Sequence, residues 1–186
     1  MKVLSAAECG LVCRNGGVVL YPTEGVWGLG CSPVDEDAVR RVLALKSREE
    51  SKGLILIAAS IAQLMPFLDI TSLSEDRWDE ISASWPGPNT WVIPASGLVP
   101  AFVRGAFQSV AVRVTSHPSV REMCNSFGGA LVSTSANVAG APSPLSFATV
   151  CSSIVSGVDA VCIGDTLGTG VASTIRDAVT GEVLRF

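Results

Sequence analysis

The sequence predicts an α/β fold with three layers, in which helices cover both faces of a twisted sheet of mixed parallel and antiparallel strands. Segments with strand character alternate with segments of helical periodicity over most of the chain, which is typical of this class. Leu54–Ala58 is an unbroken apolar run of β-type residues, as expected for a strand covered on both faces. Residues 173–178 and 182–186 flank Thr180-Gly181 and predict a closing hairpin. Because the chain has 186 residues and neither a repeat nor a linker, we expect residues 1–186 to form a single domain.

Start and stop signals mark the first elements. Ser5 and Glu8 have the spacing of a capping box, and the helix that they predict should stop at Asn15-Gly16-Gly17. Residues 18–21 follow as a short buried strand, and residues 22–30 as a loop with three glycines. The glycine spacing matches neither a dinucleotide-binding fingerprint nor a P-loop. The loop is therefore either a structural turn or a place where the backbone approaches a ligand closely.

The second helix is predicted from its acidic start and its apolar face. Residues 35–37 are acidic, which suits the first turn of a helix. Val39, Val42 and Leu43 recur at helical spacing and should face the core. The cationic run 46–52 then ends this helix and leads into the strand that begins at residue 54.

The middle of the chain contains two further predicted helices and a strand. Residues 60–64 suggest a short helix, and Ser74 is placed to cap another. That second helix should turn Trp78 and Ile81 inward and its acidic residues outward. The Pro- and Gly-rich turn after it predicts a strand over residues 91–94.

Arg113 is the unusual residue of the next segment. Residues 95–107 are predicted to be a loop, residues 110–114 a strand, and residues 118–127 a helix with proline at its start. A buried arginine in an otherwise apolar strand is costly without an anionic partner. Either a structural carboxylate or an anionic ligand would satisfy Arg113.

The strand over residues 130–137 runs into a polar loop. Ser133 and Ser135 should face one side of this strand and Thr134 the other. Ser135 and Asn137 are suited to donate hydrogen bonds to phosphate oxygens, although turn chemistry alone also explains Asn137. The remaining predicted elements before the terminal hairpin are a helix over residues 147–155, a strand over residues 159–163 and a loop over residues 164–172.

Five of the thirteen cations lie within one short segment, namely Arg40, Arg41, Lys46, Arg48 and Lys52. Such a cluster suits either a solvated helix end, where cations complement the helix dipole, or a site for a polyanion. The net charge of −4 argues against a protein that wraps nucleic acid with a broad basic face. A local anion site remains compatible with that charge.

The cysteines and the histidine carry no recognisable catalytic or metal-binding pattern. We expect the cysteines to be small, reduced core residues of a cytoplasmic protein; they are Cys9, Cys13, Cys31, Cys124, Cys151 and Cys162. The one histidine, His117, precedes Pro118 and is expected to be a loop or cap residue. No apolar run approaches the roughly 20 residues of a membrane helix, so no membrane association is expected.

Four polar segments follow or precede predicted strands, after Tyr21, Leu45, Val132 and Ala172. In α/β folds such segments commonly meet where ligands bind. We therefore expect them to converge on one edge of the sheet.

Six motifs, taken together, resemble the YrdC-like family in its short, single-domain bacterial form. They occur in the family's order from about Gly17 to the C-terminus: Tyr21-Pro-Thr-Glu with Gly28-Leu-Gly30, Lys46-x-Arg48, Lys52-Gly-Leu-Ile-Leu-Ile57, Trp85-Pro-Gly-Pro88 with Thr90, Val110-Ala-Val-Arg113, and Ser133-Thr-Ser-Ala-Asn137. Each motif is weak alone, and the six in order are specific.

The resemblance implies the YrdC α/β fold with a concave cleft and an enzyme that joins L-threonine, bicarbonate and ATP. The products are threonylcarbamoyl-AMP and pyrophosphate. A separate tRNA threonylcarbamoyl transferase complex then uses the adenylate for the t6A modification at position 37 of tRNAs that read ANN codons. Mg²⁺ is expected with ATP on chemical grounds, without identifiable protein ligands. A weak contact with tRNA also fits this interpretation.

The resemblance also assigns site residues. It implies catalytic roles for Lys46 and Arg48. It implies an ATP site formed by Lys46, Arg48, Lys52, Ser109, Ser135, Asn137 and Ser143. It implies a threonine site formed by Thr23, Gly25, Arg113, Ser133 and Ser173.

Three positions depart from the family pattern, and two other functions remain as alternatives. Gly25 replaces a threonine of many relatives, Ile57 a histidine of longer ones, and Trp27 a more usual Tyr or Phe, which leaves the contacts to the threonine side chain open. One alternative is an RNA-binding module that uses the same cleft without catalysis. The other is a carbamoyl-phosphate enzyme like the YrdC-like domain of hydrogenase maturation factors, whose additional regions this chain lacks.

Overall fold

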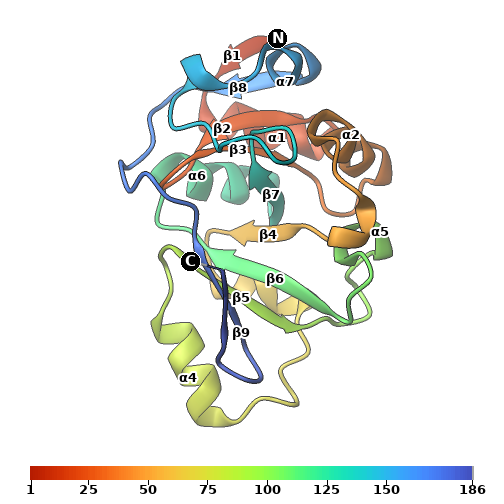
Figure 1. The fold of residues 1–186 in the computed structure, drawn as a ribbon, viewed down its shortest axis with the longest axis vertical. Coiled ribbons are helices and arrows are strands. Elements are labelled where there is room, and N and C mark those ends of the chain that lie inside the picture. Colours follow the sequence, from red (N-terminus) through yellow and green to blue (C-terminus); the bar gives the residue numbers. More distant parts are fainter. Residues whose placement is uncertain (186) are drawn as a thin grey trace.

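The computed structural model describes residues 1–185 and contains one sheet of ten strands (Figure 1). The strand order is β1-β8-β2-β3-β7-β4-β6-β5-β9-β10. The strands are β1 Lys2–Leu4, β2 Val19–Pro22, β3 Trp27–Cys31, β4 Ile55–Ala58, β5 Asn89–Pro94, β6 Ser109–Val114, β7 Leu131–Ser135, β8 Ala160–Cys162, β9 Thr174–Asp177 and β10 Val183–Arg185.

The sheet is mixed, as predicted. The pairs β1–β8, β2–β8, β4–β6 and β5–β9 are parallel, and the other neighbouring pairs are antiparallel. The C-terminal hairpin of β9 and β10 pairs with β5 and lies near the middle of the molecule (Figure 1). Strand β10 pairs only with β9 and forms one edge of the sheet, and the predicted hairpin is confirmed up to Arg185. Phe186 lies outside the described residues.

Helices cover both faces of the sheet, which confirms the three-layer prediction. The α-helices are α1 Ala6–Arg14, α2 Glu36–Lys46, α3 Ile61–Leu64, α4 Glu75–Ala83, α5 Ala101–Arg104, α6 Pro118–Phe127 and α7 Ser152–Gly157. The 3-10 turns are η1 Glu50–Lys52, η2 Met65–Phe67 and η3 Phe147–Thr149. Apolar residues of α1 and α6 form a core against one face, and α2 and α7 contribute to the larger core on the other.

The predicted start signals act as expected. Ser5 accepts a hydrogen bond from the Glu8 amide, and Glu8 accepts one from the Ser5 amide, so both halves of the capping box are present. Asp35 caps α2 and Ser74 caps α4 through their side chains. These bonds satisfy amide groups that the first turn of a helix leaves without a partner.

The glycine-rich segment is the main correction to the predicted elements. Residues 27–30 of the predicted loop 22–30 belong to strand β3, which pairs with β2 and β7. A Cβ atom on Gly30 would lie 2.5 Å from the Val132 carbonyl oxygen and 2.9 Å from the ring of Tyr21. A Cβ on Gly28 would lie 3.3 Å from the same ring. The glycines therefore make room for Tyr21 within a sheet.

Smaller differences concern short elements. The predicted loop 95–107 contains the single turn of α5, and the predicted helix 147–155 divides into η3 and α7 because Val150 and the Cys151 cap have extended backbone. Strand β1 was not predicted, since three residues show no clear period. No helix within residues 1–185 is long and apolar enough to cross a membrane.

The cysteines are all free, and five of them are buried as predicted. Cys151 is the exception, because it lies at the exposed start of α7. His117 precedes α6, which confirms its prediction as a loop or cap residue, and its Nε2 atom lies 3.0 Å from the Asp165 carbonyl oxygen.

Candidate active site

A cavity of about 530 Å³ lies on the same face of the sheet as α1 and α6, over the part of that face that these two helices do not cover. Ser109, Ala111 and Arg113 alternate along β6 and line it. The four polar segments do meet here, but on this face rather than at the predicted edge of the sheet. Since neighbouring strands run in both directions, their ends lie at opposite edges, and the shared surface is the face between them.

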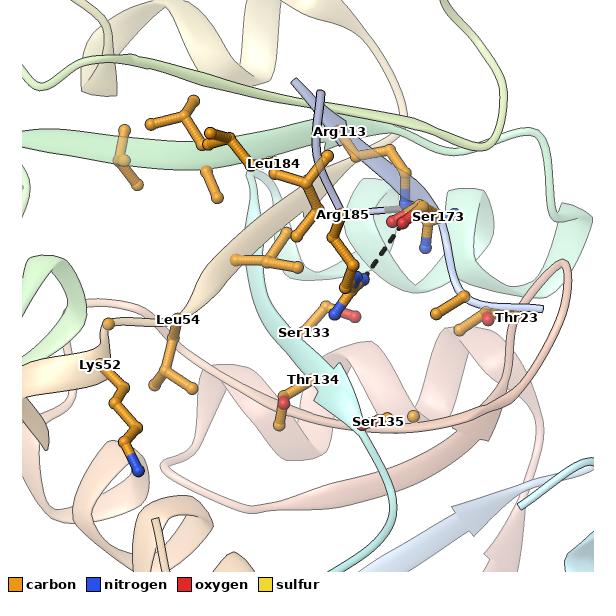
Figure 2. A pocket seen from close by; sticks show the side chains of 18 of the residues that line it. Thr23, Lys52, Leu54, Arg113, Ser133, Thr134, Ser135, Ser173, Leu184 and Arg185 are labelled. Atoms are coloured by element: carbon orange, nitrogen blue, oxygen red, sulfur yellow. Dashed lines mark hydrogen bonds between the residues drawn. The ribbon is translucent and has the colours of Figure 1, made fainter. Parts of the chain in front are cut away.

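Ten of the twelve residues expected to bind substrates line this cavity: Thr23, Gly25, Arg48, Lys52, Ser109, Arg113, Ser133, Ser135, Ser143 and Ser173. Figure 2 shows Arg113, Ser173 and Thr23 gathered on one side and Lys52 at the other. Thr134, predicted to face away, also borders the cavity at the end of β7, next to Ser135. Lys46 and Asn137 are not among the lining residues.

Arg113 has an anionic partner within the protein. Its Nη1 atom donates to Glu24 Oε2 at 2.7 Å, and the exposed fractions of the two side chains are 9% and 4%. Glu24 Oε1 accepts hydrogen bonds from the Thr115 hydroxyl at 2.7 Å and the Ser116 amide at 2.9 Å. Burial raises the pKa of Glu24, but Arg113 and these donors outweigh it and lower the pKa below its ordinary value. Glu24 thus stays ionised and holds Arg113 at the cavity wall.

Ser133 and Ser173 are each oriented by a neighbouring hydroxyl. The Tyr21 hydroxyl donates to Ser133 Oγ at 2.8 Å, so the Ser133 hydrogen is left for another acceptor. Burial raises the pKa of Tyr21 and keeps it a donor. Ser173 Oγ lies 2.7 Å from Thr90 Oγ1. Both serines therefore stand in fixed positions beside Arg113 in the same cavity.

Thr23 and Gly25 belong to the tight turn between β2 and β3. The Thr23 hydroxyl donates to the Val26 carbonyl at 2.7 Å, which leaves its oxygen lone pairs as acceptors. The segment before β9 passes closely over this turn, since a Cβ on Gly25 would lie 1.8 Å from the Val171 carbonyl oxygen. Ile57 is fully buried in the core under α1 and α6, so its side chain does not line the cavity.

Five cations line the cavity: Arg48, Lys52, Arg104, Arg113 and Arg185. Burial lowers the pKa of Arg48, whose Nε and Nη2 atoms donate to the Gly53 carbonyl at 3.2 and 3.0 Å. Burial, together with the charges of Arg48 and Arg113, also lowers the pKa of Arg185. A bound anion would offset both the burial of these two cations and the repulsion that Arg185 meets from its neighbours.

Only two carboxylates line the cavity within the described residues, and both already accept hydrogen bonds. Glu24 is bound to Arg113, and Asp177 Oδ1 accepts the amides of Val179 and Thr180 at 2.8 and 2.9 Å. The described residues hold no group of three His, Cys, Asp or Glu side chains suited to a metal. The cavity therefore favours anionic ligands.

Four residues that line or support the cavity were not predicted as site residues from the sequence: Tyr21, Glu24, Arg104 and Arg185. Tyr21 and Glu24 stand inside the quoted motif Tyr21-Pro-Thr-Glu, so the motif itself was the available signal. Arg185 lies at the end of the chain, where its Nη2 donates to the Ser173 carbonyl at 3.1 Å (Figure 2). Nothing in its sequence context indicates that the hairpin returns to the cavity.

Comparison with known proteins agrees with the fold and the motifs. The family model for Sua5, YciO and YrdC proteins, described as telomere recombination, matches residues 12–186. The chain belongs to the Sua5/YciO/YrdC family. The resemblance inferred from the six motifs is thereby confirmed.

Two relatives of this Sua5/YciO/YrdC protein are named threonylcarbamoyl-AMP synthase. That of Vibrio campbellii is 47% identical over 172 residues, which cover 92% of this chain and 93% of the relative. That of Stenotrophomonas maltophilia is 44% identical over 185 residues and is covered completely, as is this chain.

A solved structure of the family has the same fold. The crystal structure of P. abyssi Sua5 complexed with L-threonine is 31% identical, with a TM-score of 0.85. The match covers 92% of this chain and 50% of the Sua5 chain. This chain thus spans about half the length of that longer relative.

Proposed function

We propose that this chain is an L-threonylcarbamoyladenylate synthase, a nucleotidyltransferase that converts L-threonine, bicarbonate and ATP into threonylcarbamoyl-AMP, pyrophosphate and water. The observation that carries the proposal is one cavity that joins a buried Arg113 with its ordered hydroxyls to a further set of cations. The names of the close relatives, and the L-threonine complex of a more distant one, support the same activity.

The threonine side of the cavity is suited to an amino acid. Arg113 pairs with the carboxylate of threonine, because a guanidinium retains further N–H donors after its bond to Glu24. Ser133 donates its hydroxyl hydrogen, and Thr23 offers acceptor lone pairs to the amino group. Ser173, directly before β9, closes this side.

The nucleotide side is suited to a triphosphate. Arg48 and Lys52 supply positive charge, and the hydroxyls of Ser109, Ser135 and Ser143 supply donors. The threonine nitrogen attacks the bicarbonate carbon, and water leaves to give a carbamate. A carbamate oxygen then attacks the α-phosphorus, and pyrophosphate departs. Catalysis rests on positioning and on stabilising negative charge at the phosphoryl oxygens.

Mg²⁺ fits this site as a companion of ATP. Mg²⁺ commonly binds through one or two carboxylates together with substrate phosphates. Among residues 1–185, only two carboxylates line the cavity and both already accept hydrogen bonds, so the phosphates of ATP would be its main ligands. When bound, it neutralises charge on the phosphates. The protein residues hold the nucleotide through the cations and hydroxyls named above.

The product is an activated adenylate for a separate tRNA threonylcarbamoyl transferase complex, in the cytoplasm, and contributes to t6A formation. A second reading as an RNA-binding module is not favoured. Its basic groups lie inside a cavity rather than across a broad surface, and the net charge is −4.

The test is pyrophosphate release from ATP and Mg²⁺ with threonine and bicarbonate, omitting each in turn. We expect release only in the complete mixture. Arg48→Ala and Arg113→Ala should lower it at least a hundredfold, on the order of the loss of a charge-stabilising group. Arg40→Ala is the matched control, since Arg40 pairs with Glu36 on the exposed face of α2. Release that needs no threonine, or release with carbamoyl phosphate in place of bicarbonate and threonine, contradicts the proposal.

A further inference from the structure

Lys46 lies behind the nucleotide side of the cavity rather than in it. It is the last residue of α2, is only 3% exposed, and is not among the lining residues. Lys52 differs on both counts, because its side chain is 56% exposed and lines the cavity. The two lysines therefore cannot play the same part.

The contacts of Lys46 all go to one loop. Its ammonium donates to the carbonyl oxygen of Ser135 and, at 2.8 Å, to that of Asn137. Its own carbonyl accepts the Ala139 amide at 2.7 Å. Across the loop, the Ala136 amide donates to the Trp27 carbonyl at 2.8 Å. The segment that carries Ser135 is thus fixed between α2 and β3.

Buried charge explains why this arrangement depends on a cation. Within residues 1–185, no carboxylate forms an ion pair with Lys46, so the carbonyl dipoles replace its water. The carbonyl groups of Ser135 and Asn137 point at one place, where they repel each other unless a positive donor lies between them. The loop keeps this shape only while the ammonium is there.

We propose that Lys46 is a positioning residue, which holds the Ser135–Ala139 loop in the shape that binds the nucleotide and touches no substrate. This replaces the catalytic and phosphate-binding roles that the sequence motif suggested for it. The inference rests on the proposed function for the identity of the ligand, ATP. Direct contact with phosphate is left to Arg48 and Lys52, which line the cavity.

Amine labelling of the unaltered protein tests the placement. The chain has three lysines, Lys2, Lys46 and Lys52, and acetylation of each can be followed by mass spectrometry with and without ATP and Mg²⁺. We expect Lys2 to react equally in both conditions and Lys52 to be protected by ATP. Lys46 should react slowly in both. Fast labelling of Lys46 that ATP suppresses would overturn the proposal.

Hydrogen exchange separates positioning from contact. In ligand-free Lys46→Met, amides 136–139 should exchange at least tenfold faster, and ATP affinity should fall by about tenfold, as for lost bonds to a charged group. Lys52→Met, the control, should weaken ATP binding without changing exchange in this loop. Weaker ATP binding by Lys46→Met with unchanged loop exchange would contradict the positioning role, as would unchanged ATP binding.

These measurements do not depend on turnover. Should the proposed function be wrong, the unaltered protein releases no threonine-dependent pyrophosphate, while labelling and loop exchange are still measured on the ligand-free chain. Should Lys46→Met fail to fold, the labelling of the unaltered protein still decides the question.

Discussion

Arg113 is a charge inside an apolar strand, and its cost is offset by one carboxylate 89 residues earlier in the chain. Glu24 has a folded-state pKa below its unfolded value of about 4.3. A carboxyl with a depressed pKa stabilises the protein above the unfolded pKa, and this contribution is lost as the pH falls through the folded-state pKa. Glu24 should therefore account for part of the acid sensitivity of the protein.

Glu24→Gln should lower the free energy of unfolding at neutral pH by about 3 kcal/mol, because it leaves Arg113 buried without its counter-charge. The loss should begin to shrink as the pH falls below about 4.3, and it should disappear below the lower folded-state pKa, where the native carboxyl is also neutral. Urea unfolding across the acid range measures both effects. Glu75→Gln, at an exposed position of α4, controls for the removal of one carboxylate. An equal loss at all pH values would show that Gln perturbs packing rather than charge.

Tyr21→Phe isolates the hydroxyl that orients Ser133. The ring stays between the glycines of β3, and Ser133 Oγ loses its donor. One neutral hydrogen bond contributes about 1 kcal/mol, so the KM for threonine should rise about fivefold while the KM for ATP stays the same. Steady-state pyrophosphate release at varied threonine and varied ATP measures this. An equal rise in both constants would mean that the hydroxyl supports the whole cavity and not the threonine side.

The sequence alone predicts that Arg113 needs an anionic partner, but it does not identify that partner. An arginine among valines requires an anion whatever the fold, whereas the choice of Glu24 depends on which strands become neighbours. For Lys46, by contrast, the sequence suggested a partner that the structure does not support. Its motif suggested a ligand contact, yet the side chain turns beneath the Ser135 loop, and no local pattern records that direction.

At the scale of elements, the segment before β9 is held over the turn that contains Thr23 and Glu24. The amides of Leu167 and Thr169 donate to the carbonyl oxygens of these two residues at 3.4 and 3.3 Å. Gly25 allows the close approach, because any Cβ there meets the backbone of Val171. A residue with a side chain at this position would push the segment, and Ser173 after it, away from the cavity.

Gly25→Ala should therefore raise the KM for threonine by about tenfold or more, since backbone cannot yield as a side-chain tip does and Ser173 moves with its segment. Steady-state kinetics with both substrates measures the effect. Gly97→Ala is the matched control, because a Cβ on Gly97 meets nothing within 4 Å. Unchanged threonine kinetics in Gly25→Ala would show that the segment is free to move without consequence for the site.

The glycines of β3 show why this strand was predicted as a loop. Glycine is uncommon within strands, and the segment after Tyr21 contains three glycines in nine residues from Pro22 to Gly30. Gly28 and Gly30 make room for the ring of Tyr21 on the neighbouring strand β2, where Tyr21 pairs with Gly28. Only the strand pairing reveals this role. The glycine content therefore predicted a loop where the structure has a strand, although it correctly marked a segment that lies beside the site.

At the scale of the whole molecule, alternation of helix and strand signals was sufficient for the three layers but not for the strand order. Strands β1 and β8 are neighbours although almost the whole chain separates them, and the last hairpin returns to β5. Long-range pairing of this kind depends on the summed packing of two cores, and no local sequence pattern predicts it. The same pairing places Arg185 beside the other cavity cations, so the complete site emerges only from the full sheet.

A cavity with five cations and two bonded carboxylates should make the folded protein sensitive to anions. ATP with Mg²⁺ at 100 times its Kd should raise the free energy of unfolding by about 2.7 kcal/mol, because the ligand binds only the folded state. Arg185→Ala should lose most of this gain at the same ATP concentration, while Arg121→Ala, on the exposed surface of α6, should keep it. Urea unfolding with and without ATP measures the gain, and unfractionated tRNA serves as a second ligand.

Because the cations face a cavity of about 530 Å³ and the net charge is −4, tRNA should stabilise the protein far less than ATP at physiological salt. Stabilisation by tRNA that equals that by ATP and falls steeply with salt would show that the cations serve a nucleic-acid surface instead.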